Sequence, residues 1–150
     1  MSKLEKPKIV LELDSIFKSF RQGDKKIDLL NSIDLIVPEG DMVAIQGDSG
    51  SGKSTLLHIA GLLESPDEGR ILINGELMTK THFKSSNFIR RDNIGFVYQY
   101  HHLLSDFTAA ENAAIPLIIK GVSKLEAMQR AKDLLDTLGL GERLDHYPGM

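Results

Sequence analysis

The chain has 150 residues, of which 41% are hydrophobic and 26% charged, and its formal net charge is −3. This composition is typical of a soluble globular domain, and the slight acidic excess argues against nucleic-acid binding, which needs a basic face. The absence of cysteine excludes disulfides, thiolate metal sites and cysteine nucleophiles. The longest apolar runs, such as residues 113–119, are far shorter than the roughly 20 residues of a membrane-spanning helix. We therefore expect any membrane role to come through a partner.

The first part of the chain predicts strands before a glycine-rich loop. Residues 9–20 favour a strand and then a turn toward an aromatic end, and residues 27–37 favour a second, half-buried strand that residues 38–40, Pro-Glu-Gly, end. Residues 42–46, MVAIQ, form a continuous apolar run that is typical of a strand buried on both faces. A helix is expected over residues 53–63, and strand, glycine loop and helix together form half of a βαβ unit.

The following part predicts a hairpin, another strand and a change to helices. The Asn74-Gly75 pair follows an apolar run within residues 69–78, which indicates a hairpin turn. Residues 93–99, NIGFVYQ, favour a further buried strand. Because helical patterns take over after about residue 100, we expect an α/β core followed by a mostly helical region.

Two helices in this region begin with capping boxes. Thr108 with Glu111, and Ser123 with Glu126, have the spacing in which a hydroxyl and a carboxylate satisfy the first amides of a helix. In the second helix, over residues 124–138, one face is apolar, and a glycine is expected to end it. The apolar face consists of Ala127, Ala131, Leu134, Leu135 and Leu138, and the glycine is Gly139.

A phosphate-binding loop lies between the predicted strand and helix. Gly47, Gly52, Lys53 and Ser54 match the pattern G-x-x-x-x-G-K-[ST]. Glycines let successive backbone N–H groups face an anion, and the start of the helix adds its positive dipole end. A Gly/Ser linker that matches by chance is the alternative, but the strand and helix on either side disfavour it.

Each residue of this loop has an expected part in binding a nucleotide. Lys53 would contact the terminal phosphates, the Ser54 hydroxyl would ligate Mg²⁺, and Thr55 would add a phosphate hydrogen bond. Asp48 is an acid beside a phosphate site, so its side chain is expected to point outward. The complete predicted phosphate-binding set is Gly47, Asp48, Ser49, Gly50, Ser51, Gly52, Lys53, Ser54 and Thr55.

Residues 47–75, GDSGSGKSTLLHIAGLLESPDEGRILING, resemble the nucleotide-binding domains of ABC transporters throughout. The resemblance implies that Phe20 stacks on adenine, although tyrosine is commoner there; a plain strand-end aromatic is the alternative. It also implies that Gln99 is the Q-loop glutamine, which contacts Mg²⁺ and the attacking water and communicates with the membrane partner. An amide suits that role because its oxygen can accept or coordinate. The alternative for Gln99 is a surface glutamine at a strand end.

Residues 98–121 are very similar to the corresponding segment of the lipoprotein-releasing type of ABC ATP-binding subunit. The run from His101 to Phe107 matches it in order, except that Ser105 stands where proline is usual. The resemblance implies that residues near 100–121 contact two membrane permease subunits of the LolC and LolE type, at the cytoplasmic face of the inner membrane. Adjacent histidines seldom bind one ion, which disfavours a metal site at His101 and His102.

The resemblance implies an α/β fold of the P-loop NTPase class, an ABC-type nucleotide-binding domain. Residues 1–99 would form the α/β core with its N-terminal β subdomain, and residues 100–150 the start of the helical subdomain. The signature L-S-G-G-[EQ] and the apolar strand ending in Asp-Glu do not occur in the sequence, so we expect a chain truncated before the signature. The full-length protein would be a homodimeric ATPase with Lys53 and Gln99 in catalytic roles. The 150 residues alone would bind ATP and Mg²⁺ without hydrolysing ATP.

The function implied is ATP-driven release of lipoproteins from the inner membrane toward the outer membrane. Alternatives within the family are the ATPases of macrolide export or cell division, and a different alternative is a non-catalytic nucleotide-binding module. A small kinase or GTPase is disfavoured. The sequence has no N-K-x-D string for guanine, and the arginines in residues 88–93 precede a predicted strand rather than a mobile lid.

Overall fold

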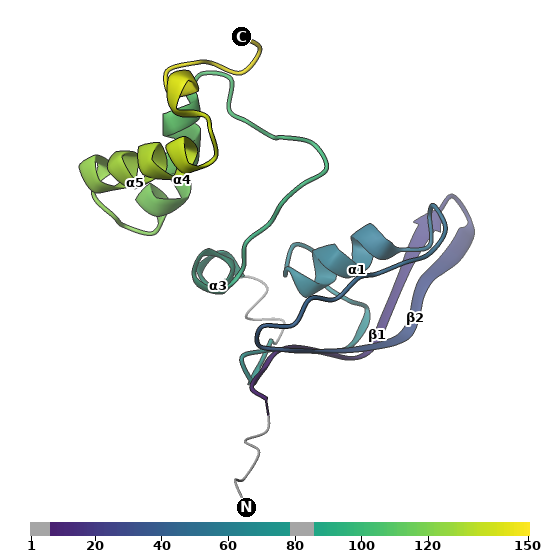
Figure 1. Ribbon diagram of the computed structural model, residues 1–150. Helices are drawn as coiled ribbons and strands as arrows, with labels where there is room; N and C mark the ends of the chain where they lie inside the picture. The colour runs from purple at the N-terminus through teal and green to yellow at the C-terminus, as the bar shows by residue number, and fades with distance from the viewer. Residues whose placement is uncertain (1–6, 79–85) are drawn as a thin grey trace, which may run out of the picture. The chain divides into compact units, whose positions relative to one another are not determined.

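A long β-hairpin forms the base of the first part of the chain (Figure 1). In the computed structural model, which describes residues 7–78 and 86–150, β1 (Ile9–Gln22) pairs antiparallel with β2 (Lys25–Pro38) across a two-residue turn. The other edge of β1 pairs with β3 (Glu68–Ile73), and β4 (Glu76–Leu77) completes a sheet of order β2-β1-β3-β4. The strands expected at residues 9–20 and 27–37 are therefore confirmed, but the turn expected before Phe20 is wrong, because β1 continues to Gln22 to pair with β2.

The predicted Asn74-Gly75 turn joins β3 to β4. Asn74 has φ 51° and Gly75 has φ 81°, as a tight hairpin turn of this kind requires. Ile73 lies opposite Glu76 across the turn. The hairpin prediction is therefore confirmed at the residue level.

The helix after the glycine loop, α1 (Lys53–Ala60), buries Leu56 and Ile59. They join the core of this part of the chain, whose other buried hydrophobic residues are Leu13, Ile16, Leu30, Leu62, Ile71, Ile73 and Met78. The helix ends three residues before the predicted end, because the backbone turns away at Gly61 and Leu62 adopts φ 57°. The predicted start at Lys53 is confirmed, and the predicted length is wrong.

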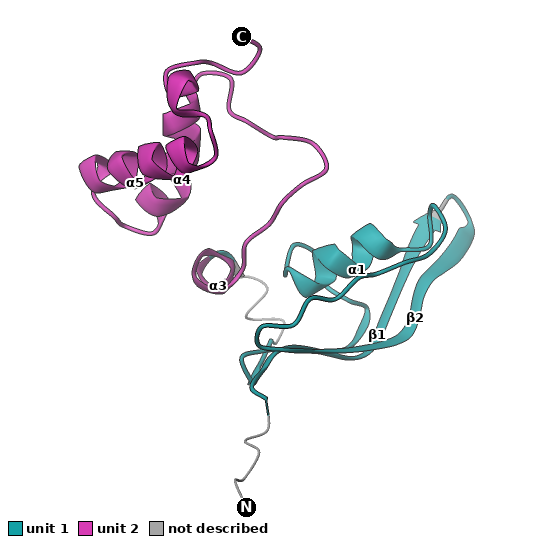
Figure 2. Cartoon of the chain, viewed as in Figure 1, with its two compact units in different colours: residues 1–87 teal, residues 88–150 magenta. Residues whose placement is uncertain are grey.

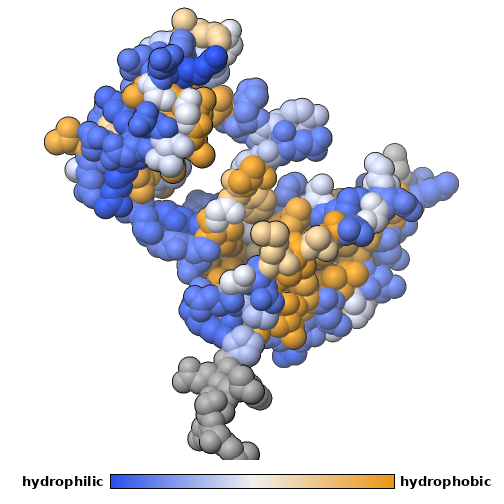
Figure 3. Space-filling view, viewed as in Figure 1, coloured by the Kyte–Doolittle hydropathy of each residue, from blue (hydrophilic) through white to orange (hydrophobic). Residues whose placement is uncertain are grey.

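Two predicted buried strands are not strands. Within the described residues, no strand pairs with residues 42–46, and Met42 is 98% exposed. Residues 93–99 begin at the last residue of α3 (Ser86–Asn93) and continue without strand structure, with Val97 99% exposed. An apolar run is buried as a strand only where neighbouring strands cover its edges. Figure 3 shows apolar side chains exposed on the viewed face of the first part of the chain.

The chain divides by its contacts into unit 1, Met1–Asn87, and unit 2, Phe88–Met150 (Figure 2). Unit 2 contains α4 (Ala109–Ile119), α5 (Lys124–Thr137) and a short 3-10 helix, η1 (Gly141–Arg143). No helix among the described residues is both long and apolar enough to span a membrane. The domain boundary expected after residue 99 stays a prediction.

Small side chains form the core between α4 and α5. Ala114, Ala127 and Ala131 are buried there, so the two helices can approach closely. Leu134 and Leu138, expected on the same buried face as the alanines, are exposed. The buried residues of α5 lie in its first eight positions, because that is the part covered by α4.

The capping box predicted at Thr108 is present, whereas only the hydroxyl half of the one predicted at Ser123 forms, because the Glu126 carboxylate accepts from Arg130 instead. The Thr108 side chain accepts from the Glu111 N–H while Glu111 bonds back to the Thr108 backbone, and Ser123 accepts from the Glu126 N–H. Gly139 follows α5 with φ 75°, as expected of a residue that stops a helix.

Candidate nucleotide-binding site

The phosphate loop is anchored to the β-hairpin by its last glycine. Gly52 is the N-cap of α1 with φ 92°, a left-handed conformation that favours glycine. It is buried, and a Cβ placed on it would lie 2.8 Å from Leu30 Cδ2 and 3.1 Å from Leu29 Cγ of β2. A side chain at position 52 would therefore push the loop off the hairpin. Because glycine offers no capping group, the first amides of α1 are available to an anion.

Lys53 bridges the opposite side of the loop. Its Nζ donates to the carbonyl oxygens of Gly47 at 2.9 Å and Asp48 at 2.6 Å, and the Ser51 N–H donates to the Asp48 carbonyl at 3.2 Å. These bonds fold the loop into a tight turn that carries the Lys53 cation. Such a turn can bind the oxygens of a phosphate chain.

The remaining predicted loop residues lie at accessible positions. Ser49 and Gly50 are exposed at the tip of the loop, and Ser54 is exposed in the first turn of α1. Thr55 is half-buried. Asp48 is exposed, as expected, and it contacts Lys53 through its carbonyl group and not through its carboxylate. The individual roles of these residues in binding stay predictions.

Phe20, the predicted adenine-stacking residue, lies near the end of β1 and is 42% exposed. The Lys18 ammonium lies over its ring, 5.4 Å from the ring centroid. Sequence reasoning singled out Phe20 and overlooked Lys18. The signal was available, because residues two apart on a strand share one face of the sheet.

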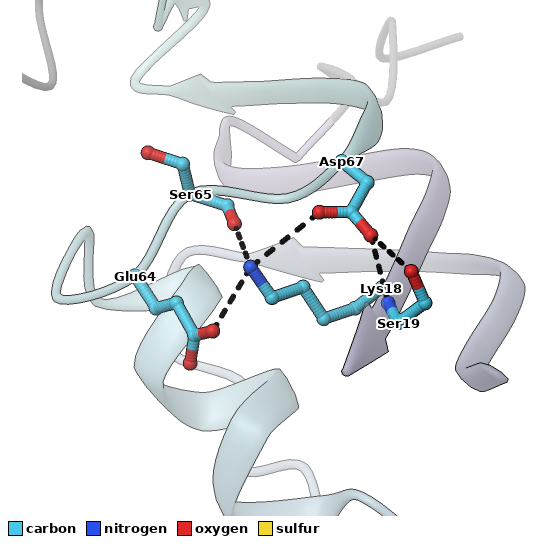
Figure 4. Close-up of polar contacts among 5 residues, drawn as sticks. All are labelled: Lys18, Ser19, Glu64, Ser65 and Asp67. Atoms are coloured by element: carbon cyan, nitrogen blue, oxygen red, sulfur yellow. Dashed lines mark hydrogen bonds and ion pairs between the residues drawn. The ribbon is translucent and has the colours of Figure 1, made fainter. Parts of the chain in front are cut away.

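Lys18 also contacts the loop that follows α1 (Figure 4). Its Nζ donates to the Ser65 carbonyl at 2.7 Å and lies 2.9 Å from Glu64 Oε1 and 3.6 Å from Asp67 Oδ1. The Lys18 side chain is only 12% exposed. This lysine therefore joins β1 to the segment beyond α1.

Asp67 secures the same loop to β1. The Ser19 hydroxyl and the Ser19 N–H both donate to Asp67 Oδ2 at 2.8 Å, and the Asp67 N–H donates to the Phe17 carbonyl at 2.9 Å. The serine hydrogen bonds, with a smaller contribution from the Lys18 charge, hold the pKa of the Asp67 carboxyl below its ordinary value. The contacts border a surface hollow of about 200 Å³.

Gln99, the predicted Q-loop residue, is exposed in unit 2, between α3 and α4. The phosphate loop belongs to unit 1, so the role of Gln99 at the nucleotide stays a prediction. Beside Gln99, Tyr98 stacks on Phe96 with ring centroids 5.2 Å apart and meets the His102 ring edge-on at 5.0 Å. These ring contacts give the segment a defined local structure.

The segment expected to contact the permease subunits has an exposed apolar surface. The large exposed apolar side chains of residues 100–121 are Tyr100, Leu103, Leu104, Phe107, Ile118 and Ile119. Asn112 of α4, which sequence reasoning overlooked, binds the backbone of this segment at Leu104, Phe107 and Thr108. An asparagine in the first turns of a helix beside an irregular segment was the available signal, since its amide can bond to nearby backbone. The apolar side chains are thus presented on a backbone shaped by hydrogen bonds.

The protein-family comparison gives a match to the ABC transporter family over residues 30–149. Two similar curated proteins carry the name lipoprotein-releasing system ATP-binding protein. LolD of Rickettsia bellii is 46% identical over 140 residues, covering 93% of this chain and 61% of that protein. LolD 1 of Rhodospirillum rubrum is 47% identical over 143 residues, covering 95% and 63%.

Solved structures of the ATP-binding cassette MJ0796 have the same fold. A dimeric structure of its post-hydrolysis form bound to ADP and Pi superposes with a TM-score of 0.81 at 36% identity, covering 92% of this chain and 61% of that one. The chain thus spans a little over three-fifths of the length of the relatives it matches. Both the family match and the fold, an ABC ATPase domain of mixed sheet and helices, lead to the same conclusion: this chain belongs to the ABC transporter family.

Proposed function

We propose that the chain is the nucleotide-binding portion of an ABC transporter ATP-binding subunit and that residues 47–55 bind the phosphates of ATP. The observation that carries this proposal is the Lys53 ammonium, hydrogen-bonded to two carbonyls across a loop that opens onto the first turn of α1. A cation and free helix amides together favour a polyphosphate over a singly charged anion. The similar cassette MJ0796 has been solved bound to ADP and Pi.

Several side chains have defined parts in this proposal. Lys53 exchanges one of its carbonyl partners for a phosphate oxygen, and Thr55 adds a hydrogen bond to the phosphates. The Ser54 hydroxyl and the Gln99 amide oxygen are hard oxygen donors of the kind that Mg²⁺ prefers. Bound at Ser54, Mg²⁺ would neutralise phosphate charge. Phe20 offers its ring to the adenine.

We propose that the 150 residues bind ATP without hydrolysing it. Hydrolysis needs a general base and a positioned water in addition to phosphate binding. In the family the base ends an apolar strand with the sequence Asp-Glu, and the second half of each site is the signature loop of a partner domain. The 150 residues contain neither the signature L-S-G-G-[EQ] nor an apolar strand that ends in Asp-Glu, since the one Asp-Glu pair, Asp67-Glu68, follows Ser-Pro. ATP hydrolysis, and the pairing of two such domains, belong in this proposal to the full-length protein.

The transport function proposed is release of lipoproteins from the inner membrane. The names of the similar proteins, at 46% and 47% identity, support it over macrolide export or cell division. In this proposal the exposed apolar side chains of residues 100–107 contact integral permease subunits, and the protein is peripheral at the cytoplasmic face of that membrane. An aromatic and leucine-rich surface suits burial against a partner.

Calorimetric titration with MgATP tests the nucleotide site. We expect the chain to bind MgATP, Lys53→Ala to weaken binding at least about tenfold, and Lys26→Ala to leave it unchanged. Lys26 is a suitable control because it is an exposed lysine of unit 1 that pairs with Asp28 at 3.0 Å. Equal losses in both variants would contradict the assigned site. Release of phosphate above the level of Lys53→Ala would contradict the proposal that the chain does not hydrolyse ATP.

Co-purification with two co-expressed lipoprotein-releasing permease subunits tests the partner surface. We expect Phe107→Asp, within the proposed contact segment, to abolish recovery of the complex. Phe88→Asp is the control, because Phe88 is an exposed phenylalanine of unit 2 outside that segment. Loss of the complex with the control alone would refute the placement of the contact surface.

A further inference from the structure

Lys18 occupies a position between an exposed aromatic ring and a loop of unit 1. Its ammonium has one hydrogen bond to the Ser65 carbonyl, ion pairs with Glu64 and Asp67, and the face of the Phe20 ring 5.4 Å away. A nearly buried lysine with partners on several sides has little freedom to leave them. Figure 4 shows the contacts of the ammonium with the loop. Because these contacts hold the ammonium in place, the Phe20 ring packs against a fixed charge.

Because the Lys18 ammonium lies over one face of the Phe20 ring, only the opposite face is left for a planar ligand. A cation is attracted to the electron-rich face of an aromatic ring, and it occupies that face at the observed distance. The ring is nevertheless 42% exposed, so a substantial part of it remains accessible. A planar ligand would therefore stack on the face away from Lys18.

The same lysine ties the ring to the helix that carries the phosphate loop. Glu64 and Ser65 follow α1, whose other end is the phosphate loop at Gly52. The start of α1 is packed on β2 at Leu29 and Leu30, and the segment after it is attached to β1 through Lys18. A helix of eight residues is about 12 Å long, so the ring and the loop are connected by a short rigid element.

We propose that Lys18 is a positioning residue for the base of the nucleotide, holding the Phe20 ring at a fixed place and orientation relative to the phosphate loop. The inference rests on the proposed nucleotide site and adds to it the residue that sets the spacing between base and phosphate subsites. A ligand that engages two subsites gains affinity when both are held in advance, because less freedom is lost on binding. Lys18 itself does not contact the nucleotide.

The test compares a complete nucleotide with its phosphate part alone. Dissociation constants for MgATP and for magnesium tripolyphosphate are measured on the 150-residue chain and on Lys18→Met, Lys18→Arg, Phe20→Ala and the double variant Lys18→Met with Phe20→Ala. Methionine keeps the unbranched stem and removes the charge. Lys26→Met is the matched control, since this lysine lies on the neighbouring strand and pairs with Asp28.

We expect Lys18→Met to weaken MgATP about three- to tenfold and to leave tripolyphosphate binding unchanged. Lys18→Arg should retain most of the affinity, because it keeps the cation over the ring. In the Phe20→Ala background the methionine substitution should have no further effect. The Asp67–Ser19 bonds persist without Lys18, and equal thermal unfolding midpoints for Lys18→Met and Lys26→Met would show that the fold is retained.

The outcomes separate this inference from the proposed function. Equal weakening of MgATP and tripolyphosphate by Lys18→Met, or an undiminished effect in the Phe20→Ala background, would overturn the role of Lys18 while leaving the nucleotide site in place. Unchanged MgATP binding in Lys18→Met would also overturn it. A chain that binds neither ligand in any variant would overturn the proposed nucleotide site, and this inference with it.

Discussion

Asn112 and Leu104 are hydrogen-bonded in both directions. The Asn112 Oδ1 accepts from the Leu104 N–H at 2.9 Å, and its Nδ2 donates to the Leu104 carbonyl at 3.1 Å. The same Nδ2 reaches the carbonyls of Phe107 and Thr108 at 2.9 and 3.0 Å. One side chain of α4 thus supplies hydrogen-bond partners to backbone groups that would otherwise bond to water.

Substitution of Asn112 by alanine should loosen the segment before α4. We expect the free energy of unfolding to fall by about 1–3 kcal/mol, because several backbone groups lose a partner. Amide exchange at Leu104 should rise well above that of the parent. Gln129→Ala is the control. The Gln129 amide is exposed on α5, and the one hydrogen bond described for its side chain is to Asp133. Unaltered exchange at Leu104 would show that the segment is shaped by something else.

Gly50→Ala and Gly52→Ala should lower the stability of the chain by different amounts. Both have positive φ, 81° and 92°, so each substitution strains the backbone by of order 1 kcal/mol. A Cβ at position 50 meets no atom within 4 Å, whereas at position 52 it collides with Leu30 and crowds Leu29. We expect Gly52→Ala to be the more destabilising by about 1–3 kcal/mol and to weaken MgATP binding. Urea unfolding measures the free energy of unfolding of both variants. Equal losses would mean that the loop can move away from Leu29 and Leu30 without cost.

Leu57 and Ile59 lie on the same helix, α1, but differ in burial. Substituting each in turn therefore tests which side of the helix faces the core. Ile59 is 0% exposed and Leu57 is 51% exposed on the same helix. Ile59→Ala should lower the free energy of unfolding of unit 1 by about 2–5 kcal/mol, since it removes core packing. Leu57→Ala should lower it by less than about 1 kcal/mol. Amide exchange across β1 and α1 measures both, and a larger effect for Leu57 would contradict the arrangement of the core.

Glu111 should make the stability of unit 2 depend on pH in the acidic range. Hydrogen bonds from the Thr108 N–H at 2.9 Å and the Thr108 hydroxyl at 3.1 Å hold the pKa of this carboxyl below its ordinary value of 4.5. A carboxyl with a lower pKa in the folded chain stabilises it fully above the unfolded pKa. That stabilisation is lost as the pH falls through the folded pKa.

Comparison with Glu111→Gln isolates this contribution. We expect the parent to lose more stability than Glu111→Gln between neutral pH and pH values below 4.5, as followed by the urea midpoint of unit 2. Glu142→Gln in η1 is the matched control for the change of net charge. Parallel pH profiles for the parent and Glu111→Gln would exclude a role for the capping box in acid sensitivity.

Features that depend on a few neighbouring residues were predictable from the sequence. The Asn74-Gly75 turn, the Thr108–Glu111 capping box and the start of α1 at Lys53 all follow from local backbone chemistry, and all three are present. The bonds from Lys53 to the Gly47 and Asp48 carbonyls also join near neighbours in the chain, whereas phosphate binding by this loop stays a prediction.

Features that depend on distant neighbours were not predictable in this way. Residues 42–46 are apolar, but whether an apolar run becomes a strand depends on which strands lie beside it, and hydropathy alone does not show that. The link from Lys18 to Ser65 spans 47 positions in the chain. Its existence depends on the turn that returns the chain to β1 after α1, and no local pattern describes that turn.

The apolar segments at residues 42–46 and 93–99, which form no strand and expose Met42 and Val97, have a practical consequence. Such stretches attract further copies of a chain, because their side chains gain by leaving water and their backbone groups gain by pairing. Light scattering from associated chains should therefore increase with protein concentration. Met42→Lys or Val97→Lys should suppress the increase. Colloidal stability, and not the free energy of unfolding, will set the highest concentration at which nucleotide affinity can be measured.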